Sequence, residues 1–132
     1  ARFRTLANTL PALIFVAEEG GNVWVNDRFP AYAGLPAEAL LGRGWSAIVH
    51  PDDLGFADRE SVRSWRERRR YEAETRFRRA DGAWRWHLVR GNAVSGAGPG
   101  AGERWVGAAV DIEDLVEARE ALAASRRAVE EA

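Results

Sequence analysis

The chain has 132 residues, of which 46% are hydrophobic and 30% are charged, and its formal net charge is −1. This size and composition are typical of one globular domain. So small a net charge gives no overall field that would attract nucleic acid or an anionic membrane. Cysteine is absent, which excludes disulfides, thiolate metal sites, cysteine nucleophiles and cysteine photoadducts.

The sequence contains neither an apolar run of the ~18 residues that a membrane span needs nor the pattern of a signal peptide. Both ends of the chain fall within a repeating pattern. We therefore expect a module of a larger, cytoplasmic protein that makes no direct contact with a membrane.

The chain begins with the signals of a short helix and a hairpin. Apolar residues with helical spacing predict an amphipathic helix over residues 2–10, and Pro11 stops it. Two β-rich apolar runs follow at residues 12–18 and 23–26, separated by two glycines. This arrangement predicts a β-hairpin.

Two short helices are predicted next. Asp27 is placed to cap a helix over residues 28–34. Pro36 suits the first turn of a second helix, and Gly42 suits its end. Segments this short are expected to cover a larger element rather than to form a layer of their own.

A longer, solvated helix is predicted to end near Arg69. The His50-Pro51 pair blocks continuation from the preceding segment, and Asp52 or Asp53 is placed to cap the helix. One histidine beside two carboxylates also suggests a metal site, but adjacent positions do not easily converge on one ion. We therefore expect turn and capping roles here, and no metal.

Three long strands with one tight turn form the main wall of the predicted fold. The first strand alternates neutral and charged residues, which is typical of a strand with one buried face. Asp81-Gly82 makes the turn to the second strand, and the Gly-rich segment 95–102 is expected to be a flexible connection. The strands are expected at residues 71–78, 83–94 and 104–112.

The third strand is apolar on both faces, so both faces need a cover. One cover is the core of the domain, and the other is a flanking helix or a partner subunit. The segment 113–132 has apolar or small residues at heptad positions, and it is predicted to be a helix. It either packs on its own domain or leaves it toward an effector. The heptad positions are Leu115, Ala118, Leu122, Ser125 and Val129.

Several motifs occur in an order that resembles the PAS family of sensory domains, in its branch with the C-terminal PAC motif. They are HPDD at residues 50–53, the turn at residues 81–82, Trp86, and WVGAAVDIED at residues 105–114. The resemblance implies an α+β fold. Its five-stranded antiparallel sheet has the order 2-1-5-4-3, with helices cupping one face and flanking helices at both ends. We divide the chain into a flanking helix (1–10), the sensory domain (11–112) and a linker helix (113–132).

The resemblance also implies a role. We expect a non-catalytic sensory, relay and dimerisation module of a signalling protein such as a two-component sensor histidine kinase. A homodimer would form through the terminal helices and the outer sheet face, and an effector domain would follow. The alternatives are a module of a cyclic-dinucleotide enzyme, a stand-alone binder of a small ligand or cofactor, and a small isomerase or hydratase.

The resemblance places two sets of residues on the two faces of the sheet. Members of the family hold haem, flavin, an aromatic acid or nothing in the cup, and we favour a filled core with no cofactor. A cysteinyl-flavin photoreceptor is excluded, and His87 is the sole candidate for a haem ligand. The residues expected to point into the cup are Phe77, His87, Val89 and Ala109. The residues expected on the outer face, against helices or a partner, are Trp84, Trp86, Leu88, Val106, Ala108 and Val110.

The junction between the last strand and the exit helix is the expected point of signal transfer. Asp111 can accept hydrogen bonds from backbone N–H groups and favour the start of the helix. Glu113 stands where the family usually has Thr or Ser, which weakens any role for a hydroxyl group at this position.

Overall fold

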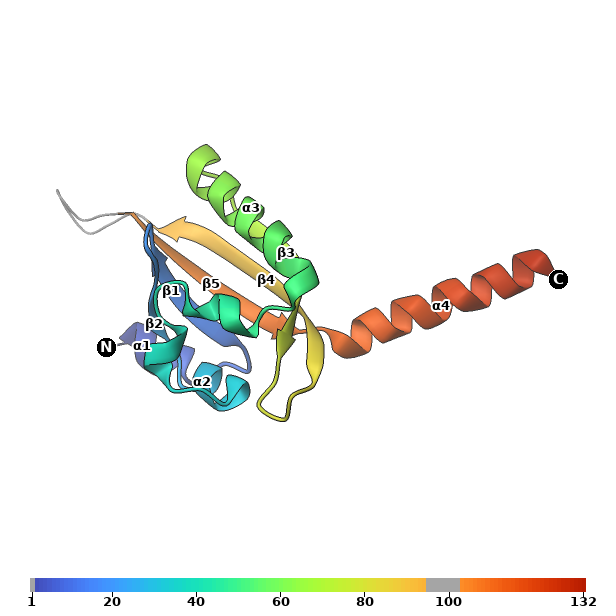
Figure 1. The fold of residues 1–132 in the computed structure, drawn as a ribbon, viewed down its shortest axis with the longest axis horizontal. Coiled ribbons are helices and arrows are strands. Elements are labelled where there is room, and N and C mark those ends of the chain that lie inside the picture. The colour runs from blue at the N-terminus through green and yellow to red at the C-terminus, as the bar shows by residue number, and fades with distance from the viewer. Residues whose placement is uncertain (1, 95–102) are drawn as a thin grey trace.

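A five-stranded antiparallel sheet, in the order β2-β1-β5-β4-β3, forms the frame of the protein (Figure 1). The computed structural model describes residues 2–94 and 103–132, and the connection predicted at 95–102 lies outside them. The predicted strand order is confirmed. The elements are α1 Arg2–Ala7, β1 Leu13–Glu18, β2 Gly21–Val25, α2 Arg28–Ala33, the 3-10 helices η1 Ala37–Leu40 and η2 Gly44–Ile48, α3 Pro51–Glu67, β3 Tyr71–Arg78, β4 Trp84–Val94, β5 Arg104–Asp111 and α4 Glu113–Glu131.

The β-strands follow the alternation of the sequence. In β3, residues alternate between buried and solvated positions, because successive side chains point to opposite faces of a sheet. Strands β4 and β5 pair in a register that sets Val89 opposite Ala109 and Gly91 opposite Gly107. In the β3–β4 turn, Gly82 has a φ of 88°, a left-handed value that glycine adopts without a steric penalty.

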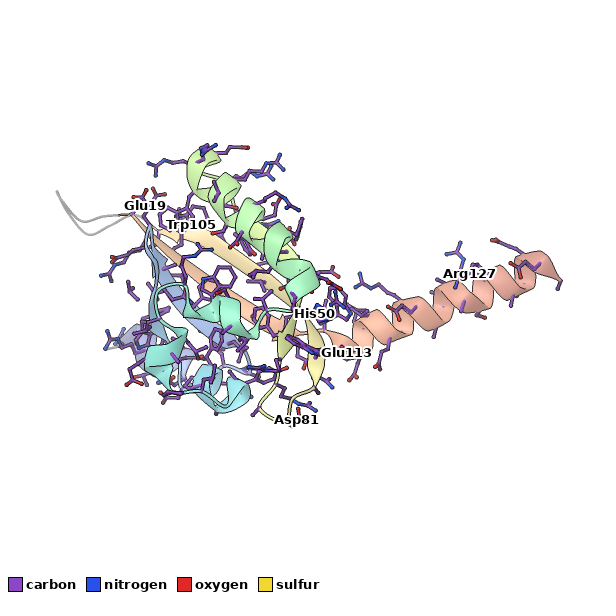
Figure 2. The ribbon with its side chains drawn as sticks, viewed as in Figure 1. Glu19, His50, Asp81, Trp105, Glu113 and Arg127 are labelled. Carbon is purple, nitrogen blue, oxygen red and sulfur yellow. The ribbon has the colours of Figure 1, made fainter. Side chains whose placement is uncertain are left out.

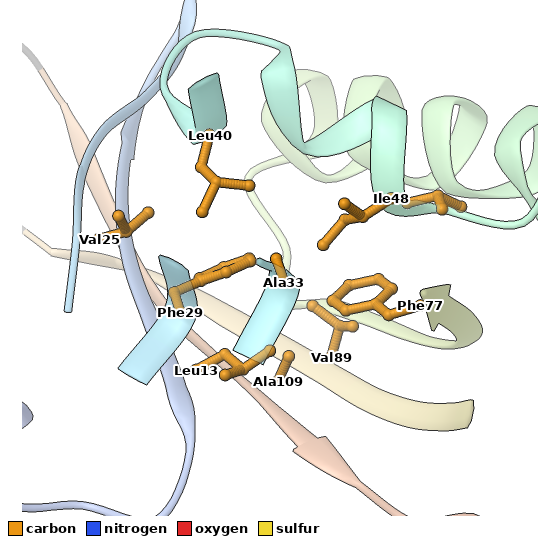
Figure 3. Packing of buried hydrophobic residues seen from close by; sticks show 10 residues of the cluster. Leu13, Val25, Phe29, Ala33, Leu40, Ile48, Phe77, Val89 and Ala109 are labelled. Carbon is orange, nitrogen blue, oxygen red and sulfur yellow. The ribbon is translucent and has the colours of Figure 1, made fainter. Parts of the chain in front are cut away.

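The hydrophobic core lies between the sheet and the shorter helices α2, η1 and η2. Phe29, Leu40 and Ile48 come from these helices and are at most 2% exposed. They meet Leu13, Val89 and other residues of the inner sheet face (Figure 3). Burying one such side chain stabilises the fold by about 1.5–3 kcal/mol, so this cluster holds α2 and the 3-10 helices on the sheet.

Two capping predictions were wrong. Asp27 occupies the N-cap position of α2 but makes no side-chain capping bond, because its backbone is helical rather than extended. His50, rather than Asp52 or Asp53, caps α3: its Nδ1 accepts a hydrogen bond from the Asp52 N–H at 3.1 Å. The Asp53 carboxylate instead accepts three hydrogen bonds from Arg76 on β3, which ties the start of α3 to the sheet.

The second short helix also differs from its prediction. Pro36 precedes a 3-10 helix that ends at Leu40, before Gly42 is reached. Gly42 follows the C-cap residue Leu41, has a left-handed φ of 60°, and pairs with Asn22 in an isolated bridge. The glycine therefore lies just past the helix end, as predicted, and it also makes a backbone contact with β2.

The exit helix α4 leaves the body of the protein. Figure 1 shows it projecting away from the sheet, and only its first turns meet β4. Its 19 residues span about 28 Å. The outer face of β5 is therefore not covered by α4, and the exposed fraction of Val110 is 45%.

Candidate functional site

A cavity of about 890 Å³ lies between α3 and the inner face of the sheet. We expected side chains to fill this space. Small residues on the sheet, such as Thr75, Gly91 and Ala109, instead leave room below α3. The cup thus has a filled half under α2, η1 and η2 and a hollow half under α3.

The four residues predicted for the pocket lie at the boundary of these halves. Phe77, Val89 and Ala109 belong to the hydrophobic core and also line the cavity. His87 is completely buried, but it is not among the residues that line the cavity. Its ring stacks on Phe77, with 4.7 Å between ring centroids, and meets the edge of Tyr32 at 5.3 Å.

His87 is held as a neutral ring. Its Nδ1 lies 2.8 Å from the Arg85 carbonyl oxygen, and because a carbonyl only accepts, Nδ1 carries the proton. The unprotonated Nε2 is buried with no hydrogen-bond partner among the described residues. Burial lowers the pKa of His87 below its ordinary value, and the bond to Arg85 opposes this effect only in part.

We expect acid to destabilise the domain through His87. The unfolded chain binds a proton near pH 6.5 while the buried ring does not, so the contribution of His87 is complete above about pH 6.5 and is lost as pH falls below it. The free energy of unfolding, measured by urea titration, should decrease from pH 7 to pH 5. His87→Gln should flatten that slope, whereas the matched His50→Gln variant should retain it. An unchanged slope in His87→Gln would contradict the assignment.

Asp111, at the end of β5, joins three elements of the structure. Its Oδ2 accepts hydrogen bonds from the Tyr32 hydroxyl of α2 at 3.0 Å and from Arg85 Nε of β4 at 2.5 Å. Its Oδ1 accepts from the Glu113 N–H at 2.9 Å, in the first turn of α4. Burial alone would raise the pKa of Asp111, but these bonds hold the pKa below its ordinary value.

The comparisons with known proteins agree with this architecture. Residues 22–109 match the sequence profile of the family described as PAS fold. The chain belongs to the PAS family. The match covers β2 from its second residue, the helices of the cup, β3, β4 and most of β5, so most of the cavity lining and four of the five strands lie within the recognised PAS domain.

Two curated relatives are a histidine kinase and a two-component sensor. Peroxide stress-activated histidine kinase mak1 of Schizosaccharomyces pombe is 32% identical over 121 residues, covering 85% of this chain and 7% of the relative. Two-component sensor PprA of Pseudomonas aeruginosa is 35% identical over 96 residues, covering 67% of this chain and 10% of the relative. The PAS domain therefore corresponds to a small part of each relative.

A solved structure shows the same fold. It is a sensory box histidine kinase/response regulator from Burkholderia thailandensis E264, with a TM-score of 0.72, 24% identity and coverage of 100% of both chains. At this identity the likeness shows the fold, while the family match and the sequence relatives support a sensory signalling module.

Glu113 has a defined place in this PAS domain. Its carboxylate accepts a hydrogen bond from the Trp86 N–H at 2.9 Å, and the Trp86 carbonyl accepts one from the Ile112 N–H at 2.8 Å. We had expected that Glu113, in place of the usual Thr or Ser, would leave this position without a hydroxyl group. The Glu113 carboxylate instead makes a hydrogen bond to the neighbouring strand. The longer side chain reaches β4 from the first turn of α4.

Sequence reasoning missed Tyr32 and Arg85 as partners of Asp111. Tyr32 lies 79 residues away along the chain, and no local pattern links it to the junction. Arg85 lies two residues before His87 on the same face of β4, but nothing in its own strand indicates that Asp111 is its partner. Burial and the bond to Asp111 raise the pKa of Tyr32, so its hydroxyl stays a donor.

The residues predicted for the outer face lie opposite the cup. Trp86 lies beneath Arg76, whose guanidinium is 4.8 Å from the ring centroid, and Trp84 meets the ring of His50 at 4.8 Å. Leu88, Val106 and Ala108 are half-buried, and Val110 is exposed. On α4, Leu115, Ala118, Leu122, Ser125 and Val129 are all exposed.

The described residues also bear on metals and membranes. No group of three histidine or carboxylate side chains within residues 2–94 and 103–132 is arranged to hold a metal ion. None of the helices in those ranges combines the length and the apolar content that a bilayer crossing requires.

Proposed function

We propose that this PAS domain is the sensory and relay module of a multidomain signalling protein, and that it passes a conformational change from the cup to α4. The observation that carries the proposal is the position of Asp111. It binds Tyr32 of the cup, Arg85 of the sheet and the first turn of α4 with one carboxylate. A displacement of α2 or β4 therefore changes the bonds that set the start of α4.

The parent protein is proposed to be a cytoplasmic sensor histidine kinase. The similarity to mak1 and PprA supports this choice, and a cyclic-dinucleotide enzyme is the alternative. In either case α4 would lead into the effector domain. A relay through a rigid helix needs a defined junction at its start, and Asp111 with Glu113 provides the bonds for one.

We expect Asp111→Asn to uncouple sensing from output in the full-length protein. The amide removes the charge that holds Arg85 and weakens the cap on α4, so the ratio of signal-on to signal-off autophosphorylation should fall about fivefold or more. Asp114→Asn is the matched control, because it removes a carboxylate charge from the first turn of α4 but leaves the bonds of Asp111 in place.

The relay would be contradicted if both variants kept the wild-type response. Circular dichroism melts of each variant would establish that the domain is folded, so that a lost response reports on coupling. The alternative effector is distinguished by the reaction product, since a cyclic-dinucleotide enzyme yields a soluble nucleotide rather than a phosphorylated histidine.

We also propose that the domain forms a homodimer. The partly exposed outer face of β5 and the exposed heptad stripe of α4 support this, since Leu115, Leu122 and Val129 are each more than half exposed. An isolated helix with such a stripe gains stability by pairing with a second copy. Sedimentation equilibrium of the full-length protein should give the mass of two chains, and a single-chain mass would contradict the proposal.

A further inference from the structure

The guanidinium group of Arg76, on β3, contacts both α3 and β4. Its Nε and Nη2 donate to the Asp53 carboxylate of α3 at 3.0 and 2.9 Å, which is the bidentate geometry that makes such a pair strong. The same group lies over the ring of Trp86, with 4.8 Å between its central carbon and the ring centroid. Arg76 therefore holds the start of α3 and the Trp86 ring at the same time.

Trp86 in turn is bonded to the start of α4 through its backbone. Its N–H donates to the Glu113 carboxylate at 2.9 Å, and its carbonyl accepts from the Ile112 N–H at 2.8 Å. Arg76 and Trp86 are direct partners in the β3–β4 register. An ion pair, a cation–π contact and a hydrogen bond thus form a continuous series of contacts from Asp53 to Glu113.

A second residue of β3 also contacts α4. Glu74 lies two residues before Arg76 on the same face of the strand, and its Oε1 accepts a hydrogen bond from Arg119 Nη2 at 2.9 Å. In α4, Glu113, the buried Val116 and Arg119 follow one another at three-residue spacing, so one side of its first two turns faces β3 and β4. Strand β3 is at the edge of the sheet, and it therefore contacts α3 through Arg76 and α4 through Glu74.

These contacts lie at the end of the sheet where α3 begins and α4 leaves. Figure 2 shows His50, just before α3, and Glu113, the first residue of α4, at this same end. Helix α3 also forms one wall of the cavity. The bonds of Asp111 run instead to Tyr32, to Arg85 and to the Glu113 N–H. The two sets of contacts therefore meet at Glu113 and are otherwise separate.

We propose that Arg76 couples α3 to α4, so that a displacement of α3 reaches the exit helix through Trp86 and Glu113 without passing through Asp111. The inference rests on the proposed relay role and adds a second route to it. Arg76 is a positioning residue in this route. The planar guanidinium binds Asp53 with its edge and stacks on an aromatic ring with its face, and the point charge of a lysine does neither in the same way.

Amide hydrogen exchange of α4 measures this coupling. Asp53→Asn breaks the ion pair with Arg76, and we expect the amides of residues 116–120 to exchange about threefold faster or more. The amides of β1 serve as the internal reference for global unfolding. Asp58→Asn is the matched control, because it makes the same change in the same helix but breaks the pair with Arg43 instead. It should leave the exchange of α4 unchanged.

A double-mutant cycle separates coupling from a purely structural effect. In the Arg76→Lys background the series of contacts is already broken, so adding Asp53→Asn should change the exchange of α4 by less than about 1.5-fold. Trp86→Leu removes the aromatic ring but leaves the ion pair, and it should abolish the effect of Asp53→Asn in the same way. This second background keeps the cycle decisive if Arg76→Lys does not fold.

Three results would overturn the proposal. They are unchanged exchange of α4 in Asp53→Asn, an equal acceleration in Asp58→Asn or in β1, and an effect of Asp53→Asn that persists in full in both backgrounds. The comparison of the two aspartate variants needs no change at Arg76. Failure here would leave the Asp111 proposal in place, because Asp111 has its own bonds and its experiment measures the output of the full-length protein.

Discussion

Replacing Asn26 with leucine is expected to lower the free energy of unfolding by about 3 kcal/mol or more. Asn26 is completely buried, and its amide makes three hydrogen bonds. Its Oδ1 accepts from the Ile14 N–H at 3.0 Å, and its Nδ2 donates to the carbonyls of Ala7 and Ala12 at 3.0 and 2.9 Å. Leucine has a similar volume but would remove all three bonds, and the Ala7 carbonyl would keep only a 3.4 Å bond from the Leu10 N–H.

Chemical denaturation at neutral pH measures this loss. Asn22→Ala is the matched control, because Asn22 is also buried but its side chain makes a single long bond, to the Leu40 carbonyl at 3.4 Å. It should cost no more than about 1 kcal/mol. Similar decreases in the free energy of unfolding in the two variants would contradict the stabilising role of the three Asn26 bonds.

The Asn26 bonds also have a functional consequence. They connect the last residue of α1 with β1, while Phe3 of α1 packs on Trp24 of β2 at 5.6 Å. Loss of the amide would release α1 from the sheet even where the rest of the domain stays folded. Amide hydrogen exchange should therefore increase first in α1 and β1.

Replacing Gly107 with alanine is expected to cost about 2–3 kcal/mol, which is the usual price of overpacking a filled site. A Cβ at this position would lie 2.6 Å from Cε2 of the Phe15 ring and 2.8 Å from the Arg90 carbonyl oxygen. The Phe15 ring borders the cavity and has room to shift, but the Arg90 carbonyl belongs to the β4–β5 ladder. The contact with this carbonyl is relieved only by displacing the backbone of the two strands.

The partner glycine across the ladder is a close control. Gly91 pairs with Gly107, but a Cβ on Gly91 would have its nearest contact at 3.7 Å, from the Val106 carbonyl oxygen. Gly91→Ala should therefore change stability little, or raise it slightly because the unfolded chain loses freedom. Thermal melts of the two variants compare them directly, and equal destabilisation would rule out the steric explanation.

Local patterns predicted the parts of the fold that depend on near neighbours. The alternation of residues 71–78 and the Asp81-Gly82 pair both appear in the structure as predicted, since the period of a strand and the φ of a turn are local properties. The helix caps were less predictable. The sequence places Asp53 where it could cap α3. In the structure, however, the Asp53 carboxylate binds the guanidinium of Arg76, 23 residues away in the chain.

The candidate functional site was also predictable only in part. Strand parity placed Phe77, Val89 and Ala109 on the inner face, but the cavity depends on how far α3 stands from the sheet, which no single strand encodes. The sequence did not indicate the partners of Asp111 for the same reason. Tyr32 reaches it only after the sheet and α2 have packed.

By itself, the sequence indicated the family through the order of its motifs, and the resemblance to that family implied the strand order. The sidedness of the long strands followed from two-residue alternation, which is a property of neighbouring residues. The tertiary structure alone decided two things: the hollow half of the cup, and the convergence of Tyr32, Arg85 and α4 on Asp111. Each depends on the distance between elements that are far apart in the chain, and packing sets that distance.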